Sequence, residues 1–392
     1  MNIPITRRRF IGRASGVALG GAAILSGAFP LGLLGSVAAH LPATSDVNGG
    51  DYRALVCLFL AGGNDAYNML MPCGAEHADY LAMRGGLHHD LKNPSGLALA
   101  QEEILSLGNP GMLLGLHPSL RGLHSLYARG KLALVANVGT LGERITKAEY
   151  HAAESPCPPG LFGHADQRQP WRDAFLTTSG GGWSDLATGH AARVLDGHAQ
   201  GNSPLNTGRG GLLVTKFPGE PGYRADPDYL PEADPARGLA AQLKAIVHAV
   251  AGRAAEGAQR QTFCVNFGGW DHHDALIPSH AQMLDIVSRG LVSFYAALEE
   301  IGAHEKVTLF TASEFGRTLA SNGSGSDHGW GGHHFVLGSA VKGGVVYGHY
   351  PSLVPEGPSI VTSRGVTIPT LSVEEYYAEL ALWLGVARDR LS

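Results

Sequence analysis

The sequence predicts an α/β protein, built as a three-layer α/β/α sandwich around a mostly parallel sheet. Two observations predict it: several short apolar runs have the composition of buried strands, and helical stretches with readable ends alternate with them. Strands that alternate with helices in this way form βα units, whose helices cover both faces of the sheet. The chain is long enough for one large domain or two smaller ones, and we predict a single domain over residues 39–392.

The first 38 residues are predicted to be a twin-arginine signal peptide. Three consecutive arginines precede Phe10 and Ile11, and residues 14–39 are apolar, small and Gly-rich, with no acidic residue. Ser36-Val37-Ala38 supplies the small-x-small pattern that a signal peptidase cuts. A membrane anchor that is never cut is the alternative, because the apolar stretch is nearly long enough to span a bilayer. We expect export to the periplasm or the extracellular side.

Removal of this segment makes the protein more acidic. The full chain has a net charge of −5, and losing Arg7, Arg8, Arg9 and Arg13 without any acid leaves −9. An acidic surface gives no electrostatic footprint for nucleic acid or anionic lipid. The sequence therefore predicts no nucleic-acid partner and no membrane attachment after cleavage.

The predicted strands are residues 54–60, 132–138, 262–267 and 307–311. Three helices are predicted. The first begins at Asp234 and ends at Gly252, the second begins at Ser279 and ends at Gly302, and the third begins at Ser372 and ends at Gly385. Residues 154–224 are rich in Gly, Pro, Ser, Trp and Asn and have weak periodicity. We predict that they leave the sheet and cover or shape a site.

The cysteines do not hold the fold together, because the chain has only 4 of them. Cys57 and Cys264 lie in apolar runs and are predicted to be buried. Cys73 and Cys157 lie in Pro/Gly-rich loops. In an oxidising compartment these two either pair or stay reduced.

Polar side chains follow three of the predicted strands. Asp65 comes after the run 54–60, although Gly-Gly-Asn-Asp is also an ordinary turn sequence. Asp271 and His273 come after the run 262–267, and alternation along an extended segment lets these two reach the same point while His272 points away. The carboxyl ends of parallel strands meet at one edge of a sheet, so we expect these groups to be neighbours.

The third group follows the run 307–311 and is the richest in charge. It contains Glu314, Arg317, Asp327 and His328. A structural salt bridge between Glu314 and Arg317 is the alternative to a role in a site.

These groups together predict a metal site. Several carboxylates crowded into one crevice require a compensating cation. Carboxylate and imidazole ligands without Cys suit Zn, Mn or Fe better than Ca. We predict one divalent metal ion or two, which could hold an anionic ester and lower the pKa of bound water, with Arg317 holding an oxyanion.

The residue blocks also resemble a known family. The blocks are the arginine leader, Leu60-Ala61-Gly62-Gly63-Asn64-Asp65-Ala66-Tyr67-Asn68, Gly268-Gly269-Trp270-Asp271-His272-His273, Ser313-Glu314-Phe315-Gly316-Arg317-Thr318 and Asp327-His328-Gly329. In order and completeness they resemble a large uncharacterised family of exported bacterial proteins, placed in the alkaline phosphatase and sulfatase superfamily. The resemblance implies an alkaline-phosphatase-like fold and metal ligands at Asp65, Asp271, His273, Glu314, Asp327 and His328.

One departure from the family's pattern concerns the nucleophile. Hydrolases of the superfamily use a Ser, Thr or modified Cys, which takes the phosphoryl or sulfuryl group. Where the family tends to have a Thr-Arg-Ser-His-Phe-like stretch, this chain has Ala148 and Glu149 in place of the hydroxyl and the imidazole. Thr146 is therefore the candidate nucleophile, although Thr is also a frequent helix cap.

Three functional hypotheses follow. The first is an exported metal-dependent hydrolase of a phosphate or sulfate ester, carried by a small molecule or a polysaccharide. The second is a non-catalytic binding or assembly protein on a hydrolase fold, working beside another exported protein, which the substitutions at Ala148 and Glu149 favour. The third makes the metal site redox-active. Folds of this kind keep the scaffold and change the chemistry, so the residues of the site have to decide among them.

Overall fold

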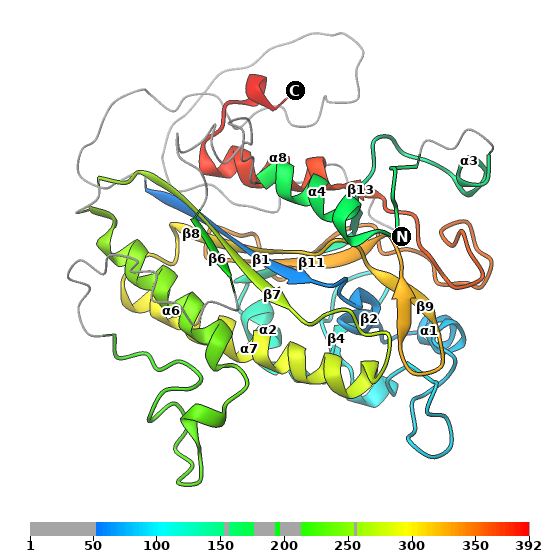
Figure 1. Cartoon of the computed structure of the whole chain (residues 1–392), viewed down its shortest axis with the longest axis horizontal. Helices are drawn as coiled ribbons and strands as arrows, with labels where there is room; N and C mark the ends of the chain where they lie inside the picture. Colours follow the sequence, from blue (N-terminus) through cyan, green and yellow to red (C-terminus); the bar gives the residue numbers. More distant parts are fainter. Residues whose placement is uncertain (1–51, 153–156, 176–192, 197–212, 255–256, 392) are drawn as a thin grey trace.

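The computed structural model describes residues 52–152, 157–175, 193–196, 213–254 and 257–391 (Figure 1). The predicted signal peptide, and with it the alternative of a membrane anchor, lies outside these residues. Within the described part of the chain, no helix combines the length and the apolar character needed to cross a membrane.

In the described part of the chain, eight strands form a central sheet in the order β12-β5-β11-β8-β1-β7-β6, with β13 also paired to β5. Only β11 runs antiparallel to its neighbours, β5 and β8. The predicted fold class is confirmed, and all four predicted strands are present. The strands of this sheet are β1 (Arg53–Ala61), β5 (Leu132–Gly139), β6 (Arg193–Asp196), β7 (Arg260–Gly268), β8 (Val307–Ala312), β11 (Gly332–Leu337), β12 (Val346–Gly348) and β13 (Leu371–Ser372).

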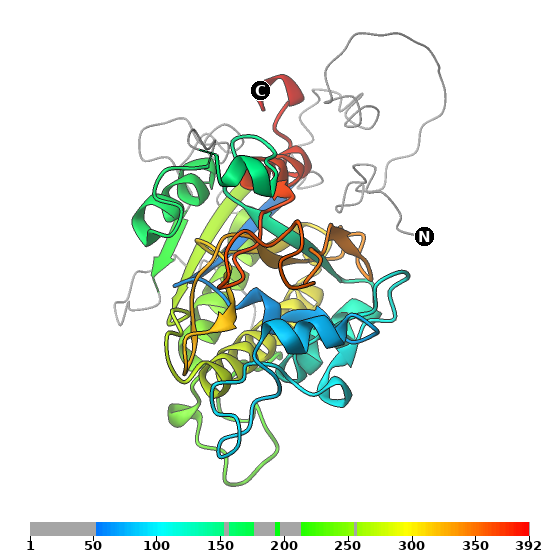
Figure 2. The ribbon, with the colours of Figure 1, turned by 90° about the vertical axis from the view of Figure 1, so that its right-hand side faces the viewer.

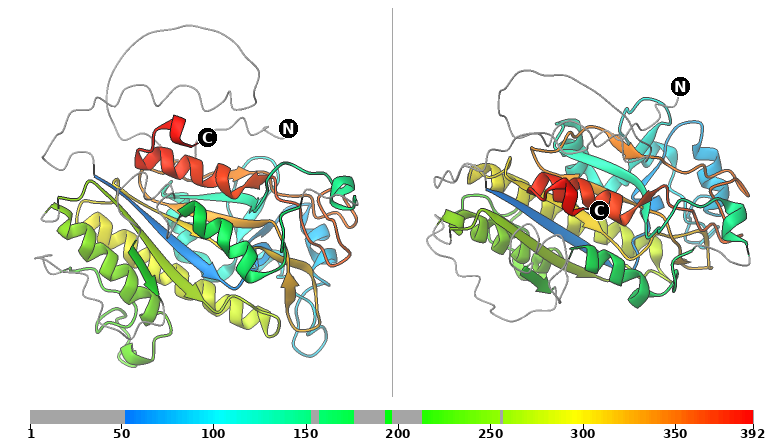
Figure 3. Two further views of the ribbon diagram at one scale, coloured as in Figure 1. Left: turned by 45° about the horizontal axis from the view of Figure 1, so that its top comes forward. Right: turned by 90° about the horizontal axis from the view of Figure 1, so that it is seen from above.

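Helices cover both faces of this sheet. Figures 1 and 3 show α6, α7 and α2 on one face, and α4 and α8 on the other. Among the described residues, the α-helices are α1 (His77–Met83), α2 (Arg121–Ala128), α3 (Lys147–Tyr150), α4 (His164–Phe175), α6 (Arg237–Ala251), α7 (Leu276–Glu300) and α8 (Val373–Leu384). Short 3-10 helices span Ala66–Asn68, Gln101–Glu103, Pro118–Leu120, Pro231–Ala233, Gly252–Ala254 and Arg388–Arg390.

The central strand β1 shows why the strands are continuous apolar runs in the sequence. Val56 and Leu58 belong to the core under α6 and α7, whereas Leu55 and Cys57 belong to the core under α8. Each face of the strand is therefore buried, and each buried Val or Leu contributes about 1.5–3 kcal/mol. Cys264 of β7 is buried in the same way as Cys57, as predicted.

Two small sheets stand beside the central one. The strands β2 (Leu70–Pro72), β4 (Leu114–Leu116) and β3 (Leu105–Ser106) form one, and β9 (Arg317–Ser321) and β10 (Ser326–His328) form an antiparallel pair. Figure 2 views the molecule from the side to which β1 points, where the loops after the central strands lie. The β9–β10 pair is at this end and carries Asp327 and His328.

The predicted helix ends are confirmed in part. Ser372 caps α8 in a capping box with Glu375, and Gly385 ends it with a positive φ. The predicted start at Ser279 is wrong, because α7 begins at Leu276. Leu276 is fully buried, and Pro278 is tolerated in the first turn, so tertiary packing extends the helix beyond its local signal.

The stretch 154–224 differs from the prediction that it leaves the sheet. Among its described residues, Arg193–Asp196 form β6, which pairs in parallel with β7. Residues His164–Phe175 form α4, with Pro170 inside it. The internal proline and the mixed composition hide this helix from a search for periodicity.

Cys73 and Cys157 are not joined by a disulfide. Cys73 packs at the edge of a cluster around Tyr67 and Tyr80. Cys157 packs at the edge of a different cluster, around Trp330.

Candidate functional site

The loops after β1, β7 and β8 meet at one end of the sheet. Gly62 has a φ of 126°, and a Cβ atom there would lie 2.5 Å from the backbone nitrogen of Asp271. The loop after β1 can therefore approach the loop after β7 this closely only with glycine at this position. The predicted convergence of these strand ends is present.

Asp271 lies at the centre of a cluster of polar side chains. Its Oδ1 atom is 2.8 Å from Nη1 of Arg317, 3.0 Å from Nε2 of His273 and 3.2 Å from Nε2 of His328. Its Oδ2 atom is 3.4 Å from Nε2 of His164. Asp271 remains partly exposed, with 42% of its side chain accessible, so the cluster is open to solvent.

The surroundings of Asp271 stabilise its charged form. Partial burial acts against the charge, but the hydrogen bond from Arg317 and the charge of its guanidinium outweigh it, and the nearby His273 and His328 act in the same direction. The pKa of Asp271 is therefore below its ordinary value.

Contacts at Nδ1 orient both histidines beside Asp271. Nδ1 of His328 lies 2.7 Å from the carbonyl oxygen of Phe162, which only accepts, so this nitrogen carries the proton. Nδ1 of His273 lies 3.3 Å from Oδ1 of Asp327. The hydrogen bond from Asn322 and the nearby Arg364 and His273 outweigh burial and lower the pKa of Asp327, so its carboxylate accepts. In a neutral ring with its proton on Nδ1, each Nε2 atom faces Oδ1 of Asp271 as an acceptor, which is the form of histidine that binds a metal ion.

Glu314 is fully buried beside this cluster. Its carboxylate accepts hydrogen bonds from the backbone nitrogens of Gly62, at 2.9 Å, and Gly63, at 3.1 Å. Arg168 donates to the same carboxylate through Nε and Nη2, and Nδ1 of His164 lies 3.6 Å away. Glu314 thus joins the loop after β1 to helix α4.

Asp327 reaches the cluster through another residue. Its Oδ1 atom contacts His273 and Asn322, and its Oδ2 atom pairs with Arg364. This arrangement orients His273 from behind, as outer carboxylates orient metal-bound histidines.

The structure does not bring Asp65 into the cluster. Asp65 and Arg84 form an ion pair in which both side chains are fully buried. Arg84 also donates to the carbonyl oxygens of Thr318, at 3.2 Å, and Leu319, at 3.3 Å. Asp65 therefore anchors the loop after β1 to the end of α1.

Arg317 is fully buried and is engaged on all sides. Its Nε atom donates to Ser326, and its Nη1 atom donates to the carbonyl oxygen of Gly62 and to Asp271. Its Nη2 atom donates to the carbonyl oxygen of Ser326. These contacts hold three loops in place, and the binding of an oxyanion by Arg317 stays a prediction.

Thr146 lies in the N-cap position of α3. Its hydroxyl accepts a hydrogen bond from the backbone of Glu149, whose carboxylate accepts from Thr146 in return. The side chain is exposed, and none of its described contacts involves the cluster around Asp271. Glu149, which departs from the family's pattern, thus completes a capping box.

We expect the Thr146→Ala variant to keep its metal content and any ester turnover, because the substitution removes only a cap. Removing a nucleophile would instead cost several orders of magnitude in rate. Steady-state turnover of the variant measures the difference, with Thr146→Ser as the control that keeps the hydroxyl. A loss of turnover in Thr146→Ala that Thr146→Ser restores would contradict the cap assignment.

The other histidines near the site are buried and neutral. Burial lowers the pKa of His272 to about 4, and His272 packs against Trp270 and His280 on the far side of the loop, as alternation predicted. Burial likewise lowers the pKa of His333 and His334 to about 3. Nδ1 of His333 accepts a hydrogen bond from the backbone of Asn137, so this residue has a structural part in β11.

Sequence reasoning missed His164 and Arg168. Both lie on α4, four residues apart and therefore on one helix face, and both approach Glu314. The sequence signal for these two residues was their i, i+4 spacing after Gly163. The helix itself was not predicted, because the surrounding segment is rich in Gly, Pro and polar residues.

The cluster fits a metal ion. His164, Asp271 and His328 each offer a ligand atom, and these atoms lie within 4.8 Å of one another. Two imidazoles and a carboxylate form a donor set typical of transition metals. His273 adds a further imidazole, whose Nε2 atom lies 3.0 Å from Oδ1 of Asp271 and 3.1 Å from Nε2 of His328.

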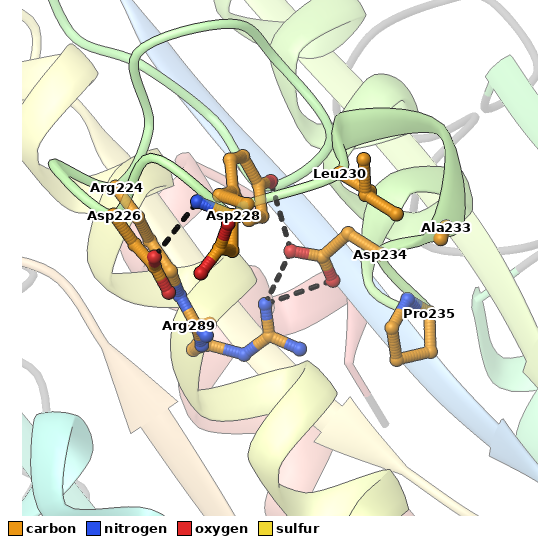
Figure 4. A pocket seen from close by; sticks show the side chains of 9 residues that line it. Arg224, Asp226, Asp228, Leu230, Ala233, Asp234, Pro235 and Arg289 are labelled. Atoms are coloured by element: carbon orange, nitrogen blue, oxygen red, sulfur yellow. Dashed lines mark hydrogen bonds and ion pairs between the residues drawn. The ribbon is translucent and has the colours of Figure 1, made fainter.

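An open pocket of about 280 Å³ lies elsewhere, between the loop before α6 and helix α7 (Figure 4). Arg289 of α7 donates through Nη1 to both carboxylate oxygens of Asp234, and through Nε to Asp285. The pocket shares no residue with the cluster around Asp271. Burial acts against the charge of Asp234, but hydrogen bonds from Arg289, the backbone of Ala236 and Tyr229 outweigh it and lower its pKa.

This pair predicts a dependence of stability on pH. A lowered pKa means that the contribution of Asp234 is present above its ordinary pKa near 4 and is lost as the pH falls below it. We expect Asp234→Asn to lower the free energy of unfolding by about 2–3 kcal/mol at neutral pH, and by less at pH 3. Denaturant unfolding at several pH values measures this, with the exposed Asp228→Asn as the control. An equal loss at both pH values would contradict it.

One known protein family matches the part of the chain that contains most of this site. A family described as a protein of unknown function (DUF1501) matches residues 232–375. The matched segment includes the stretches around Asp271, Glu314 and Asp327 and excludes the one around Asp65. No curated protein sequence matches the chain.

Solved structures with a similar arrangement are distant from this chain. The crystal structure of Ps i-CgsB in complex with k-i-k-neocarrahexaose has 11% identity and a TM-score of 0.37, covering 86% of this chain and 74% of that chain. The lipoteichoic acid synthase LtaP from Listeria monocytogenes has 9% identity and a TM-score of 0.34, covering 84% of this chain and 76% of that chain. The C-terminal periplasmic domain of EcEptC from Escherichia coli has 9% identity and a TM-score of 0.36, covering 88% of this chain and 86% of that chain.

Proposed function

We propose that this chain is an exported, metal-dependent hydrolase of a phosphate or sulfate ester, carried by a small molecule or a polysaccharide. One observation carries the proposal. Nε2 of His273, Nε2 of His328 and Oδ1 of Asp271 lie 3.0 to 3.2 Å from one another, and each can act as a metal ligand when the two rings are neutral with the proton on Nδ1. Two imidazoles and a carboxylate oxygen that converge this closely form a donor set suited to a transition-metal ion.

The chain's own residues prepare such a site. Arg317 fixes the carboxylate of Asp271, the carbonyl oxygen of Phe162 fixes the ring of His328, and Asp327 fixes the ring of His273. Helix α4 brings His164 to the other carboxylate oxygen of Asp271, with Glu314 behind its ring. A divalent metal bound there would polarise an ester oxygen and lower the pKa of a coordinated water. The absence of Cys from this donor set favours Zn, Mn or Fe over a thiolate site or a calcium site.

The arginine leader supports export of the folded protein by the twin-arginine route, which would allow the metal to be loaded before transport. The test is therefore elemental analysis of protein recovered from its natural compartment, together with assays on phosphate and sulfate esters. We expect bound metal in the unaltered protein and its loss in His164→Ala. The exposed His151→Ala is the matched control and should keep its metal. Unaltered protein that contains no metal, or that hydrolyses esters fully after chelation, would refute the proposal.

A second candidate is a non-catalytic binding or assembly protein that uses the same site to hold an anionic ligand or a partner exported with it. The capping box of Thr146 and Glu149 favours it, because the hydroxyl of the candidate nucleophile is engaged in that box. Metal-loaded protein that binds an ester or a polysaccharide without turning it over would favour this candidate over the hydrolase.

A further inference from the structure

Every acidic side chain predicted as a metal ligand has an arginine beside it. The pairs are Asp65 with Arg84, Asp271 with Arg317, Glu314 with Arg168, and Asp327 with Arg364. The crowding of carboxylates predicted from the sequence is therefore largely neutralised by the chain itself. The number of metal ions that the site requires falls accordingly.

The pair of Asp65 and Arg84 is the most enclosed of the four. Both side chains have no solvent exposure, and the pair is surrounded by Tyr67 and Tyr80 and by the backbone of β9. One oxygen of Asp65 binds Arg84, and the other has no hydrogen-bond partner in the described structure. A second metal ion at Asp65 would need further ligands, but the group of ligand atoms formed by His164, Asp271 and His328 does not include Asp65, whose described side-chain partner is Arg84.

Glu314 is unavailable to a second ion for a related reason. Both of its oxygens accept hydrogen bonds from the backbone of Gly62, and Arg168 binds the oxygen that faces His164. Coordination by Glu314 would require the loop after β1 or helix α4 to give up these bonds. The fold thus uses this carboxylate to assemble the site.

We propose that Arg84 supplies to Asp65 the positive charge that a second metal ion would otherwise supply, so that any metal bound by this chain lies in the cluster around Asp271, formed with His164, His273 and His328, and not at Asp65. The location of that metal rests on the proposed function. The ion pair between Asp65 and Arg84 does not rest on the proposed function, and it can be tested in metal-free protein.

The first experiment measures metal content by elemental analysis of natively exported protein. We expect about one metal ion per chain, unchanged in Asp65→Asn and at least tenfold lower in Asp271→Asn. If Asp65→Asn does not fold, the double variant Asp65→Asn/Arg84→Met takes its place, because replacing both members of a buried pair is often tolerated. Two ions per chain, with one lost on substitution of Asp65, would overturn the proposal while leaving the proposed function intact.

The second experiment separates a metal ligand from an ion-pair partner. We expect Asp65→Asn to lower the midpoint of thermal unfolding by about 5 °C, equally with and without a chelator, because its partner is Arg84. The double variant should lose less than the sum of the two single variants. Asp234→Asn, which breaks a buried ion pair outside the site, is the matched control for a loss independent of metal.

The outcomes can be told apart. An effect of Asp65→Asn that disappears in the chelated protein identifies Asp65 as a metal ligand and overturns the proposal. Unaltered protein without metal refutes the proposed function, and the comparison of single and double variants then still decides whether Asp65 belongs to Arg84.

Discussion

Asp271→Asn is expected to lose metal binding and ester turnover together. Its carboxylate is the point at which Arg317, His273, His328 and His164 meet, and asparagine keeps the shape but removes the charge. Substitution of even an outer residue in a metal site lowers affinity by about 10–100-fold, so for Asp271 we expect a loss of about 100-fold or more. Titration of chelated protein with Zn²⁺ or Mn²⁺ measures the affinity, and turnover of an ester measures the activity.

The control for this substitution comes from the same loop. Asp274 is exposed and lies outside the cluster, so Asp274→Asn should leave metal affinity unchanged. Retention of both metal and activity by Asp271→Asn would show that the cluster is a hydrogen-bonded surface feature.

Arg317→Met is expected to have the largest effect on stability. The substitution leaves the carbonyl oxygens of Gly62 and Ser326 without their donor, and each buried acceptor left unpaired costs about 1–3 kcal/mol. We expect the free energy of unfolding to fall by about 3 kcal/mol, with a smaller loss in Arg317→Lys, which keeps the charge but not the planar fork. Denaturant unfolding measures this loss.

This prediction also separates two roles of Arg317. A residue that binds only an oxyanion would affect turnover and leave stability unchanged, whereas a residue that holds three loops affects both. The matched control is Arg144→Met, which breaks an exposed ion pair with Glu375 and should cost less than about 1 kcal/mol. A loss of turnover in Arg317→Met with unchanged stability would contradict the structural role and favour the predicted oxyanion role.

The sequence alone predicted the fold class, because buried parallel strands must be apolar on both faces and therefore stand out in the chain. Leu55 and Val56 face opposite layers, and this requirement is visible without coordinates. The cap of α8 at Ser372 was equally readable, because a capping box depends only on residues three apart. The start of α7 was not, because burial of Leu276 against distant residues decides it.

The sequence also determined which residue types follow each strand, and this placed Asp271, His273 and His328 at one edge of the sheet. It could not assign partners to the acids, because an arginine such as Arg84 or Arg168 becomes a neighbour only through tertiary packing. The tertiary structure therefore decided that Asp65 is neutralised inside the protein, that Glu314 holds a loop, and that His164 completes the group around Asp271. The alternation of side chains along a strand and the position of its end are local properties of the sequence. The net charge around Asp271 depends instead on every segment that folds against it.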